Sequence, residues 1–207
     1  MVTVLVLIAY LLGSIPTSVW IGKTFYNIDV REFGSGNAGA TNTFRVLGRS
    51  AGIPVLIIDI IKGALSVALS YFSTFEIGSN AFVDLQLALG VAALIGHIFP
   101  IFAGFRGGKG VATILGIVIC IVPTACALSL LVFLICLLSS RIVSLSSMLA
   151  GVSFPIFLNI VLGNNNPILL VFSIIVALLL IVTHRKNIKR LLKKEESKVN
   201  LFTVKNK

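Results

Sequence analysis

Long, uninterrupted apolar runs dominate this sequence, and short polar segments separate them. Several runs approach or exceed the ~20 residues that a helix needs to cross a bilayer. The runs are continuous rather than alternating, which favours membrane helices over a transmembrane β-barrel. The sequence therefore predicts an all-α, polytopic membrane helix bundle, with apolar runs at 3–21, 53–72, 81–103, 111–138, 148–162 and 167–183.

The run at 111–138 decides how many spans are predicted. As one helix it gives six spans, and both the loop containing Arg141 and the C-terminal tail would then lie outside. As two short helices that turn at Pro123 and Thr124 it gives seven spans, and every basic loop then faces the cytoplasm. The positive-inside rule favours the second reading. We predict seven transmembrane helices, with the N-terminus outside and the C-terminus cytoplasmic.

Composition and charge agree with a membrane protein. Of the 207 residues, 57% are hydrophobic and only 12% are charged. The net charge is +10, but 9 of the 17 basic residues follow Thr183, which indicates a cytoplasmic end near anionic lipid rather than nucleic-acid binding. No basic residue precedes the first apolar run, so we expect a retained span rather than a signal peptide. We predict one transmembrane domain, 1–191, followed by a basic cytoplasmic tail, 192–207.

The first polar segment, GSGNAGATNTFR at 34–45, carries the groups of an anion-binding loop. Its glycines allow positive φ and let backbone N–H groups converge on an anion. Arg45 adds a planar fork that matches phosphate. Gly34, Gly36 and Gly39 also fit the dinucleotide pattern GxGxxG, but that site needs a preceding strand, and here a predicted span comes first. The alternative is a flexible polar loop.

The second polar segment, FRGGKGVAT at 105–113, is typical of a phosphate-binding turn at the start of a helix. It is not a Walker motif, because Ala103 stands at the first glycine position and Gly110 follows Lys109. An ordinary tight turn between spans, with cations that extend to the interface, is the alternative.

Two more polar segments follow later spans. In SRIVSLSS, Arg141 lies among hydroxyl groups, and could either hold phosphate or mark the membrane interface. In HRKNIKRL, His184 and Asn187 share one face of a continuing helix, as do Asn187 and Arg190. A basic tail on anionic lipid is the alternative, but it does not explain His184 or Asn187. The predicted topology places all four polar segments on the cytoplasmic side.

Asp59 and Lys62 lie three residues apart within the second predicted span. Ionisable residues inside a span usually face the bundle interior and serve function. The two could neutralise each other, or they could orient a loop cation such as Arg45 or Lys109. His97, at the end of the next span, could be a base or a structural hydrogen-bonding group. The spacing of histidines and carboxylates predicts no metal site.

Together these motifs resemble the bacterial acyl-phosphate:glycerol-3-phosphate acyltransferase family, known as PlsY. The resemblance covers essentially the whole chain and rests on GSGNAGATNTFR, on Asp59 with Lys62 and Gly63, on GHIFPIFAGFRGGKGVAT, on SRIVSLSS and on HRKNIKRL, in this order. Three positions depart from the family's pattern. These are Ala38 where Pro is frequent, Arg106 where Lys is common, and Lys194 where Gly is usual.

The resemblance implies an enzyme of the bacterial inner membrane with its active site at the cytoplasmic face. It implies acyl transfer from acyl phosphate to the primary hydroxyl of glycerol 3-phosphate, giving lysophosphatidic acid and inorganic phosphate in the first committed step of phospholipid synthesis. It implies no cofactor, and a soluble partner that produces acyl phosphate. The expected catalytic residues are Ser35, Arg45, Lys109, His184 and Asn187. The expected substrate-binding residues are Gly34, Gly36, Asn37, Thr41, Asn42, Gly107, Gly108, Arg141 and Ser144, with Asp59, Lys62 and His97 in support.

The chemistry of the residues agrees with this implication. Both substrates carry phosphate, and the donor's apolar tail can stay in lipid while its head group reaches Arg45 and Lys109. Cations that bridge the phosphates would align the acceptor hydroxyl and stabilise charge on the leaving phosphate. Because phosphate leaves readily, a substrate phosphate oxygen could accept the proton, with His184 as the alternative base.

Rival functions fit the sequence less well. Acyl-CoA-dependent acyltransferases usually show HxxxxD, but Phe102 and Lys189 stand five positions after the two histidines. A transporter would place polar residues near the bilayer midplane, often in repeated halves, whereas these segments share one face and show no repeat. A membrane scaffold would leave the four polar segments unexplained.

Overall fold

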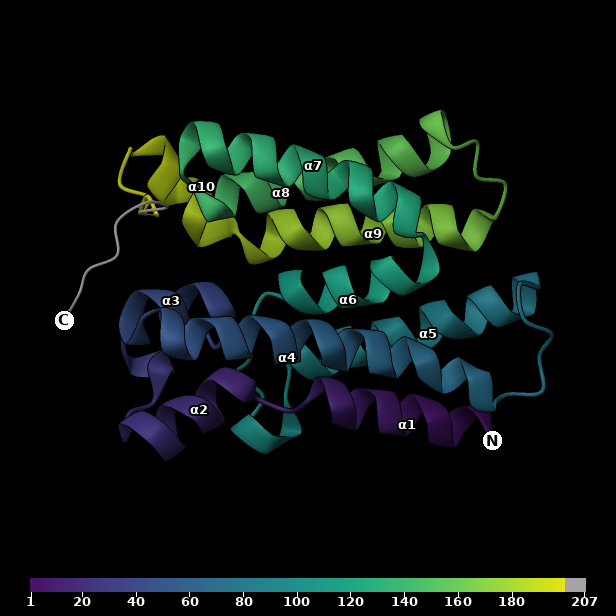
Figure 1. The fold of residues 1–207 in the computed structure, drawn as a ribbon, viewed down its shortest axis with the longest axis horizontal. Helices are drawn as coiled ribbons and strands as arrows, with labels where there is room; N and C mark the ends of the chain where they lie inside the picture. Colours follow the sequence, from purple (N-terminus) through teal and green to yellow (C-terminus); the bar gives the residue numbers. More distant parts are fainter. Residues whose placement is uncertain (200–207) are drawn as a thin grey trace. The chain divides into compact units, whose positions relative to one another are not determined.

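The computed structural model describes residues 1–199, and these form helices and turns without a strand. They separate into two compact units, residues 1–123 (unit 1) and residues 124–199 (unit 2). The predicted tail, 192–207, is described as far as Val199, and its remainder lies outside the described residues. Figure 1 shows the elements in chain order.

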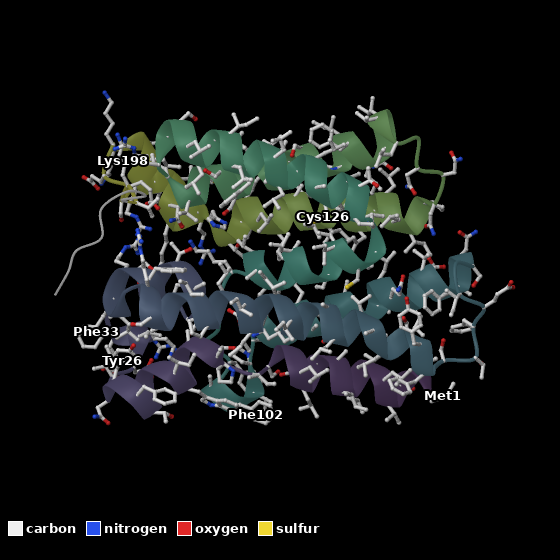
Figure 2. The ribbon with its side chains drawn as sticks, in the orientation of Figure 1. Met1, Tyr26, Phe33, Phe102, Cys126 and Lys198 are labelled. Carbon is white, nitrogen blue, oxygen red and sulfur yellow. The ribbon has the colours of Figure 1, made fainter. Side chains whose placement is uncertain are left out.

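Unit 1 holds the helices that surround the first two polar segments. Its elements are α1 (Val2–Gly13), α2 (Thr17–Tyr26), η1 (Val30–Glu32), α3 (Ala40–Leu47), α4 (Arg49–Ala68), η2 (Leu69–Phe72), α5 (Asn80–Ile98), η3 (Ile101–Ala103) and α6 (Val111–Ile121). Helices α1 and α2 follow each other along the unit, so that Met1 lies at the opposite end from Tyr26 and Phe33 (Figures 1 and 2).

The first predicted span is not one continuous helix. It breaks between Gly13 and Thr17, where α1 and α2 meet at a bend of 40°. The break contains Pro16, which lacks an N–H and disfavours helical backbone at the residue before it. The sequence prediction of a single helix at 3–21 missed this break, because hydropathy alone carries no signal for it.

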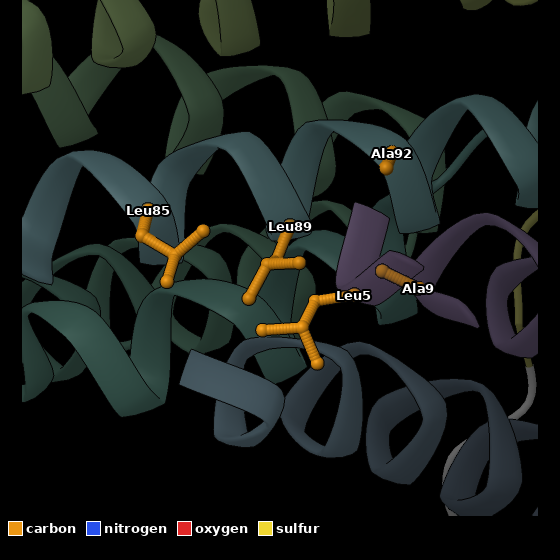
Figure 3. Close-up of a cluster of buried hydrophobic side chains, with 5 residues drawn as sticks. All are labelled: Leu5, Ala9, Leu85, Leu89 and Ala92. Atoms are coloured by element: carbon orange, nitrogen blue, oxygen red, sulfur yellow. The ribbon is translucent and has the colours of Figure 1, made fainter. Parts of the chain in front are cut away.

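The core of unit 1 depends on close helix packing. Leu5 and Ala9 of α1 are buried against Leu85, Leu89 and Ala92 of α5 (Figure 3). Helices α4 and α6 pack through glycines, because a Cβ on Gly63 would overlap the Thr113 carbonyl oxygen and one on Gly116 would overlap that of Ile60. Such small residues let membrane helices approach backbone to backbone, where dispersion contacts stabilise the pair.

Unit 2 holds the third and fourth polar segments. Its helices are α7 (Pro123–Ser140), α8 (Val143–Ile156), a π-helical turn η4 (Phe157–Val161), α9 (Pro167–Thr183) and α10 (Arg185–Leu192). Helix α9 has the bounds that its apolar run predicts. Helices α9 and α10 meet at a bend of 58° beside His184.

The ambiguous run at 111–138 is two helices, as the charge distribution predicts. Helix α6 ends at Ile121, Val122 has non-helical backbone angles, and α7 begins at Pro123. Within the described residues, four helices are long and apolar enough to cross a membrane, or up to six if each bent pair is one span. The apolar helix Val111–Ile121 is shorter. The structure therefore shows an all-helical chain with several candidate spans, and seven spans stay a prediction.

Candidate functional site

The first polar segment takes its shape from Asn42. This side chain is 2% exposed, and its Oδ1 accepts hydrogen bonds from Ser35 N (2.8 Å) and Ser35 Oγ (3.1 Å). Its Nδ2 donates to the carbonyl oxygens of Val30 (2.8 Å) and Phe33 (3.1 Å). The side-chain amide group thus binds the loop backbone, and the amide oxygen holds Ser35 in place. The glycine prediction is confirmed at Gly34 and Gly36, whose φ angles are 62° and 71°.

Helix α3 divides the rest of this segment between two faces. Asn42 and Thr43 are buried, whereas Thr41 and Arg45 are exposed. Thr41 and Arg45 are four residues apart and therefore share the exposed face. The expectation of a polar loop through residue 45 is corrected here, because Ala40 onwards is helical. Gly39, in extended conformation, is the N-cap residue of this helix.

The second polar segment lies against the first. Ala38 N donates to the Gly107 carbonyl oxygen (3.4 Å), and Gly108 N donates to the His97 carbonyl oxygen (3.1 Å). A Cβ on Gly108 would overlap the His97 ring, and one on Gly107 would overlap the His97 carbonyl oxygen. Only glycines allow this close approach. Lys109, half-buried, follows directly, so Arg45 and Lys109 belong to segments that the fold joins.

Arg31, which precedes the first polar segment, links η1 to the turn after η3, and the sequence reasoning assigned it no role. Its Nη1 donates to the carbonyl oxygens of Ala103 (2.7 Å) and Arg106 (3.4 Å). Its Nε and Nη2 bind both carboxylate oxygens of Asp29, at 2.9 and 2.7 Å. These hydrogen bonds from Arg31 hold the pKa of Asp29 below its ordinary range, although partial burial opposes them. In the sequence, the opposite charges of Asp29 and Arg31 at a spacing of two residues were the signal that could have indicated this ion pair.

Asp59 and Lys62 form a buried ion pair in α4, with Lys62 Nζ 2.9 Å from Asp59 Oδ1. Lys62 Nζ also donates to the Ile15 carbonyl oxygen (2.9 Å), and Thr17 Oγ1 donates to Asp59 Oδ1 (3.1 Å). Ile15 lies in the break between α1 and α2, and Thr17 is the first residue of α2. The pair therefore binds polar groups at the broken helix, which lipid could not satisfy. His97 Nδ1, also buried, lies 3.9 Å from Asp59 Oδ1.

His184 is held in one tautomer at the bend between α9 and α10. It is 3% exposed, and its Nδ1 lies 2.7 Å from the Leu180 carbonyl oxygen. A carbonyl oxygen only accepts, so Nδ1 carries the hydrogen and Nε2 is the acceptor nitrogen of the neutral ring. This is the form that a general base requires.

Ser144 and Asn187 meet at one carboxylate in unit 2. Ser144 Oγ (2.9 Å) and Asn187 Nδ2 (2.6 Å) both donate to Glu196 Oε1, and Arg190 Nε donates to Glu196 Oε2 (2.6 Å). The predicted common face of Asn187 and Arg190 is confirmed by this shared partner. Sequence reasoning assigned Glu196 no role and included it only in the predicted basic cytoplasmic tail, 192–207. Arg141, predicted to bind substrate, is exposed and has a φ of 60°.

The fold thus joins the four polar segments in two pairs. Unit 1 brings 34–45 and 104–110 together, and unit 2 brings 141–147 and 184–190 together. Among the residues that the structure describes, no group of three His, Cys, Asp or Glu side chains could hold a metal ion. Apolar helices with cationic, glycine-rich polar segments define an integral membrane protein suited to phosphate-bearing ligands.

Comparison with known proteins narrows this class. The family model described as glycerol-3-phosphate acyltransferase matches residues 3–194. A glycerol-3-phosphate acyltransferase of Enterococcus faecalis is 46% identical over 96% of this chain and 92% of the relative. One of Bacillus cytotoxicus is 45% identical over 98% of this chain and 97% of the relative. The chain belongs to the glycerol-3-phosphate acyltransferase family.

Two solved structures share the fold over nearly the whole chain. A crystal structure of PlsY (YgiH), an integral membrane glycerol 3-phosphate acyltransferase, in its glycerol 3-phosphate form is 39% identical with a TM-score of 0.86, over 98% of this chain and 99% of that one. The lysophosphatidic acid form is 38% identical with a TM-score of 0.81, over 96% and 95%.

Proposed function

We propose that this chain transfers a fatty acyl group from acyl phosphate to the primary hydroxyl of glycerol 3-phosphate, at the cytoplasmic face of a bacterial inner membrane. The products are lysophosphatidic acid and inorganic phosphate. The observation that carries the proposal is the junction of the two glycine-rich segments, which gives Arg45 and Lys109 a common framework. Family membership and the ligands of the related PlsY structures support the acceptor and the product.

The proposed role of each residue follows from the chemistry of its side chain. Arg45, with its planar fork, and Lys109, with its compact charge, hold the phosphates of the two substrates. Ser35 donates its N–H and its hydroxyl hydrogen to Asn42, so it shapes the loop that carries Arg45. The N–H groups of Gly107 and Gly108 bind the Ile98 and His97 carbonyl oxygens and so hold the turn that precedes Lys109. Binding both head groups places the acceptor hydroxyl next to the acyl carbonyl, so the two reacting groups no longer have to meet by diffusion in the correct orientation.

The reaction itself exchanges one carbon–oxygen bond for another. The acceptor hydroxyl oxygen attacks the acyl carbonyl carbon, and the bond from that carbon to the phosphate oxygen breaks. The hydroxyl proton passes either to a substrate phosphate oxygen or to His184 Nε2. Arg45 and Lys109 stabilise the charge that develops on the departing phosphate. Ser144 and Asn187 take part as polar groups that orient the acceptor.

The proposal is tested with purified protein in lipid, with palmitoyl phosphate and palmitoyl-CoA as alternative donors and glycerol 3-phosphate as acceptor. We expect lysophosphatidic acid and inorganic phosphate from palmitoyl phosphate alone. Lys109→Ala should reduce kcat at least ~100-fold, since it removes charge stabilisation from the transition state. Lys23→Ala, which removes an exposed cation of the same unit, should leave kcat nearly unchanged.

Product from palmitoyl-CoA would overturn the donor assignment. No product from either donor, in a sample shown to be folded, would favour transport and lead to uptake assays in vesicles. His184→Ala separates the two proton acceptors. A loss of less than about tenfold in kcat would assign the proton to a substrate phosphate oxygen, whereas a larger loss would assign it to His184. Binding to a soluble enzyme that produces acyl phosphate is a further expectation, testable by co-purification.

A further inference from the structure

The segment after α10 folds back onto the polar groups of unit 2. Lys194 has a positive φ of 60°, and Glu195 N donates to the Arg190 carbonyl oxygen (2.8 Å). Farther along, Val199 N donates to the Arg141 carbonyl oxygen (2.8 Å). Between these two attachments the side chain of Glu196 turns inward and is only 4% exposed.

The Glu196 carboxylate is bound on both oxygens. Oε1 accepts from Ser144 Oγ and Asn187 Nδ2, and Oε2 accepts from Arg190 Nε. Burial by itself raises the pKa of this carboxyl, but the hydrogen bonds from Arg190, Asn187 and Ser144 together outweigh burial, so the net direction of the pKa is downward. Glu196 is therefore ionised at neutral pH, and its charge-assisted hydrogen bonds are of the strong kind.

These hydrogen bonds fix the orientation of Ser144 and Asn187, two residues that the proposed reaction uses. A serine hydroxyl has one hydrogen, and donation to Glu196 directs the serine's lone pairs elsewhere. Donation from Asn187 Nδ2 fixes the plane of its amide, and hence the position of Oδ1. An amide or hydroxyl group that rotates freely must lose that freedom before it can orient a substrate hydroxyl. A group that is already oriented avoids this entropic cost during the reaction.

We infer that Glu196 is a positioning residue, whose carboxylate orients Ser144 and Asn187 for acyl transfer. The inference rests on the proposed function, because it takes these two side chains as part of the reaction. The contrary reading makes Glu196 an anion that competes with substrate for the same donors. Burial, three donors and two backbone attachments favour a fixed part of the site over a group that leaves at every turnover.

The test compares Glu196→Ala and Glu196→Gln with Glu195→Ala, which removes the neighbouring exposed carboxylate. We expect Glu196→Ala to lower kcat by about 10- to 100-fold with little change in KM for glycerol 3-phosphate, since orientation matters most in the transition state. Glu196→Gln should fall between Glu196→Ala and wild type, because it keeps one acceptor oxygen. Glu195→Ala should match wild type.

A double variant shows whether Glu196 acts through its partners. If it does, Glu196→Ala should cost much less activity in the background Ser144→Ala/Asn187→Ala than in wild type. Thermal unfolding in detergent shows whether each variant is folded. If Glu196→Ala does not fold, the activity of Glu196→Gln, whose side chain has nearly the same shape as that of glutamate, tests the inference instead.

Three results would overturn the inference while wild type remains active. These are equal activity of Glu196→Ala and Glu195→Ala, higher activity of Glu196→Ala than wild type, and equal losses in both backgrounds. Higher activity would establish Glu196 as a competitor for substrate. Wild type without activity on palmitoyl phosphate would instead contradict the proposed function, so the two failures are distinguishable.

Discussion

At the scale of single residues, the hydrogen bonds of the Asn42 side chain hold the first polar segment in its conformation. Replacing it with alanine leaves the Val30 and Phe33 carbonyl oxygens and the Ser35 N–H without their partner. Each buried group left unpaired costs about 1–3 kcal/mol. We expect Asn42→Ala to lower thermal stability and to abolish most acyl transfer, measured by unfolding in detergent and by product formation.

Thr74→Ala, at an exposed polar position of the same unit, is the matched control and should change neither property. Full activity of Asn42→Ala would show that Ser35 keeps its position without this side chain.

The buried pair of Asp59 and Lys62 makes a second prediction at this scale. Lys62→Met leaves the Asp59 carboxylate uncompensated and the Ile15 carbonyl oxygen without its donor. Loss of one partner of a buried pair costs about 3–5 kcal/mol. The double variant Asp59→Asn/Lys62→Met removes both charges, so its thermal stability should exceed that of Lys62→Met. A double variant as unstable as the sum of the two single changes would contradict the pairing.

At the scale of elements, Asp29 and Arg31 connect η1 to the turn that follows η3. The pKa of Asp29 is lowered from its ordinary value of 3.8 by Arg31, so its contribution to stability is present above that pH and is lost as pH falls below it. Asp29→Asn should therefore be less stable than wild type at neutral pH. The difference in melting temperature should narrow below about pH 4.

Melting curves of both proteins between about pH 7 and pH 3 provide the measurement. Glu32→Gln, an exposed carboxyl in the same 3-10 turn, is the control. A difference between Asp29→Asn and wild type that does not depend on pH would mean that charge is not what Asp29 contributes.

At the scale of the whole molecule, the number of spans decides which segments share a side of the membrane. Seven spans place Thr74 outside and Lys186 in the cytoplasm, whereas six spans place both outside. In a variant with Cys120, Cys126 and Cys136 replaced by serine, single cysteines at these two positions report their side. We expect a membrane-impermeant maleimide to label position 74 in intact cells and position 186 only after permeabilisation.

Labelling of both positions in intact cells would favour six spans and would remove the cytoplasmic assignment of the third and fourth polar segments, those that contain Arg141 and His184. Labelling of position 186 alone would reverse the predicted orientation. Unaltered lipid-facing cysteines would confuse the readout, and Cys120 is exposed in the structure, which is why the background variant is needed.

The sequence by itself determined the membrane class, the break at Pro123 and the four polar segments. Run length, proline and charge are local properties that act wherever the chain folds, so they are readable along the sequence. The tertiary structure alone decided that Asn42 supports Ser35, that Arg31 links two loops and that Glu196 binds Ser144. The last two contacts join residues 72 and 52 positions apart. Such pairings arise only when packing brings a particular donor to a particular acceptor.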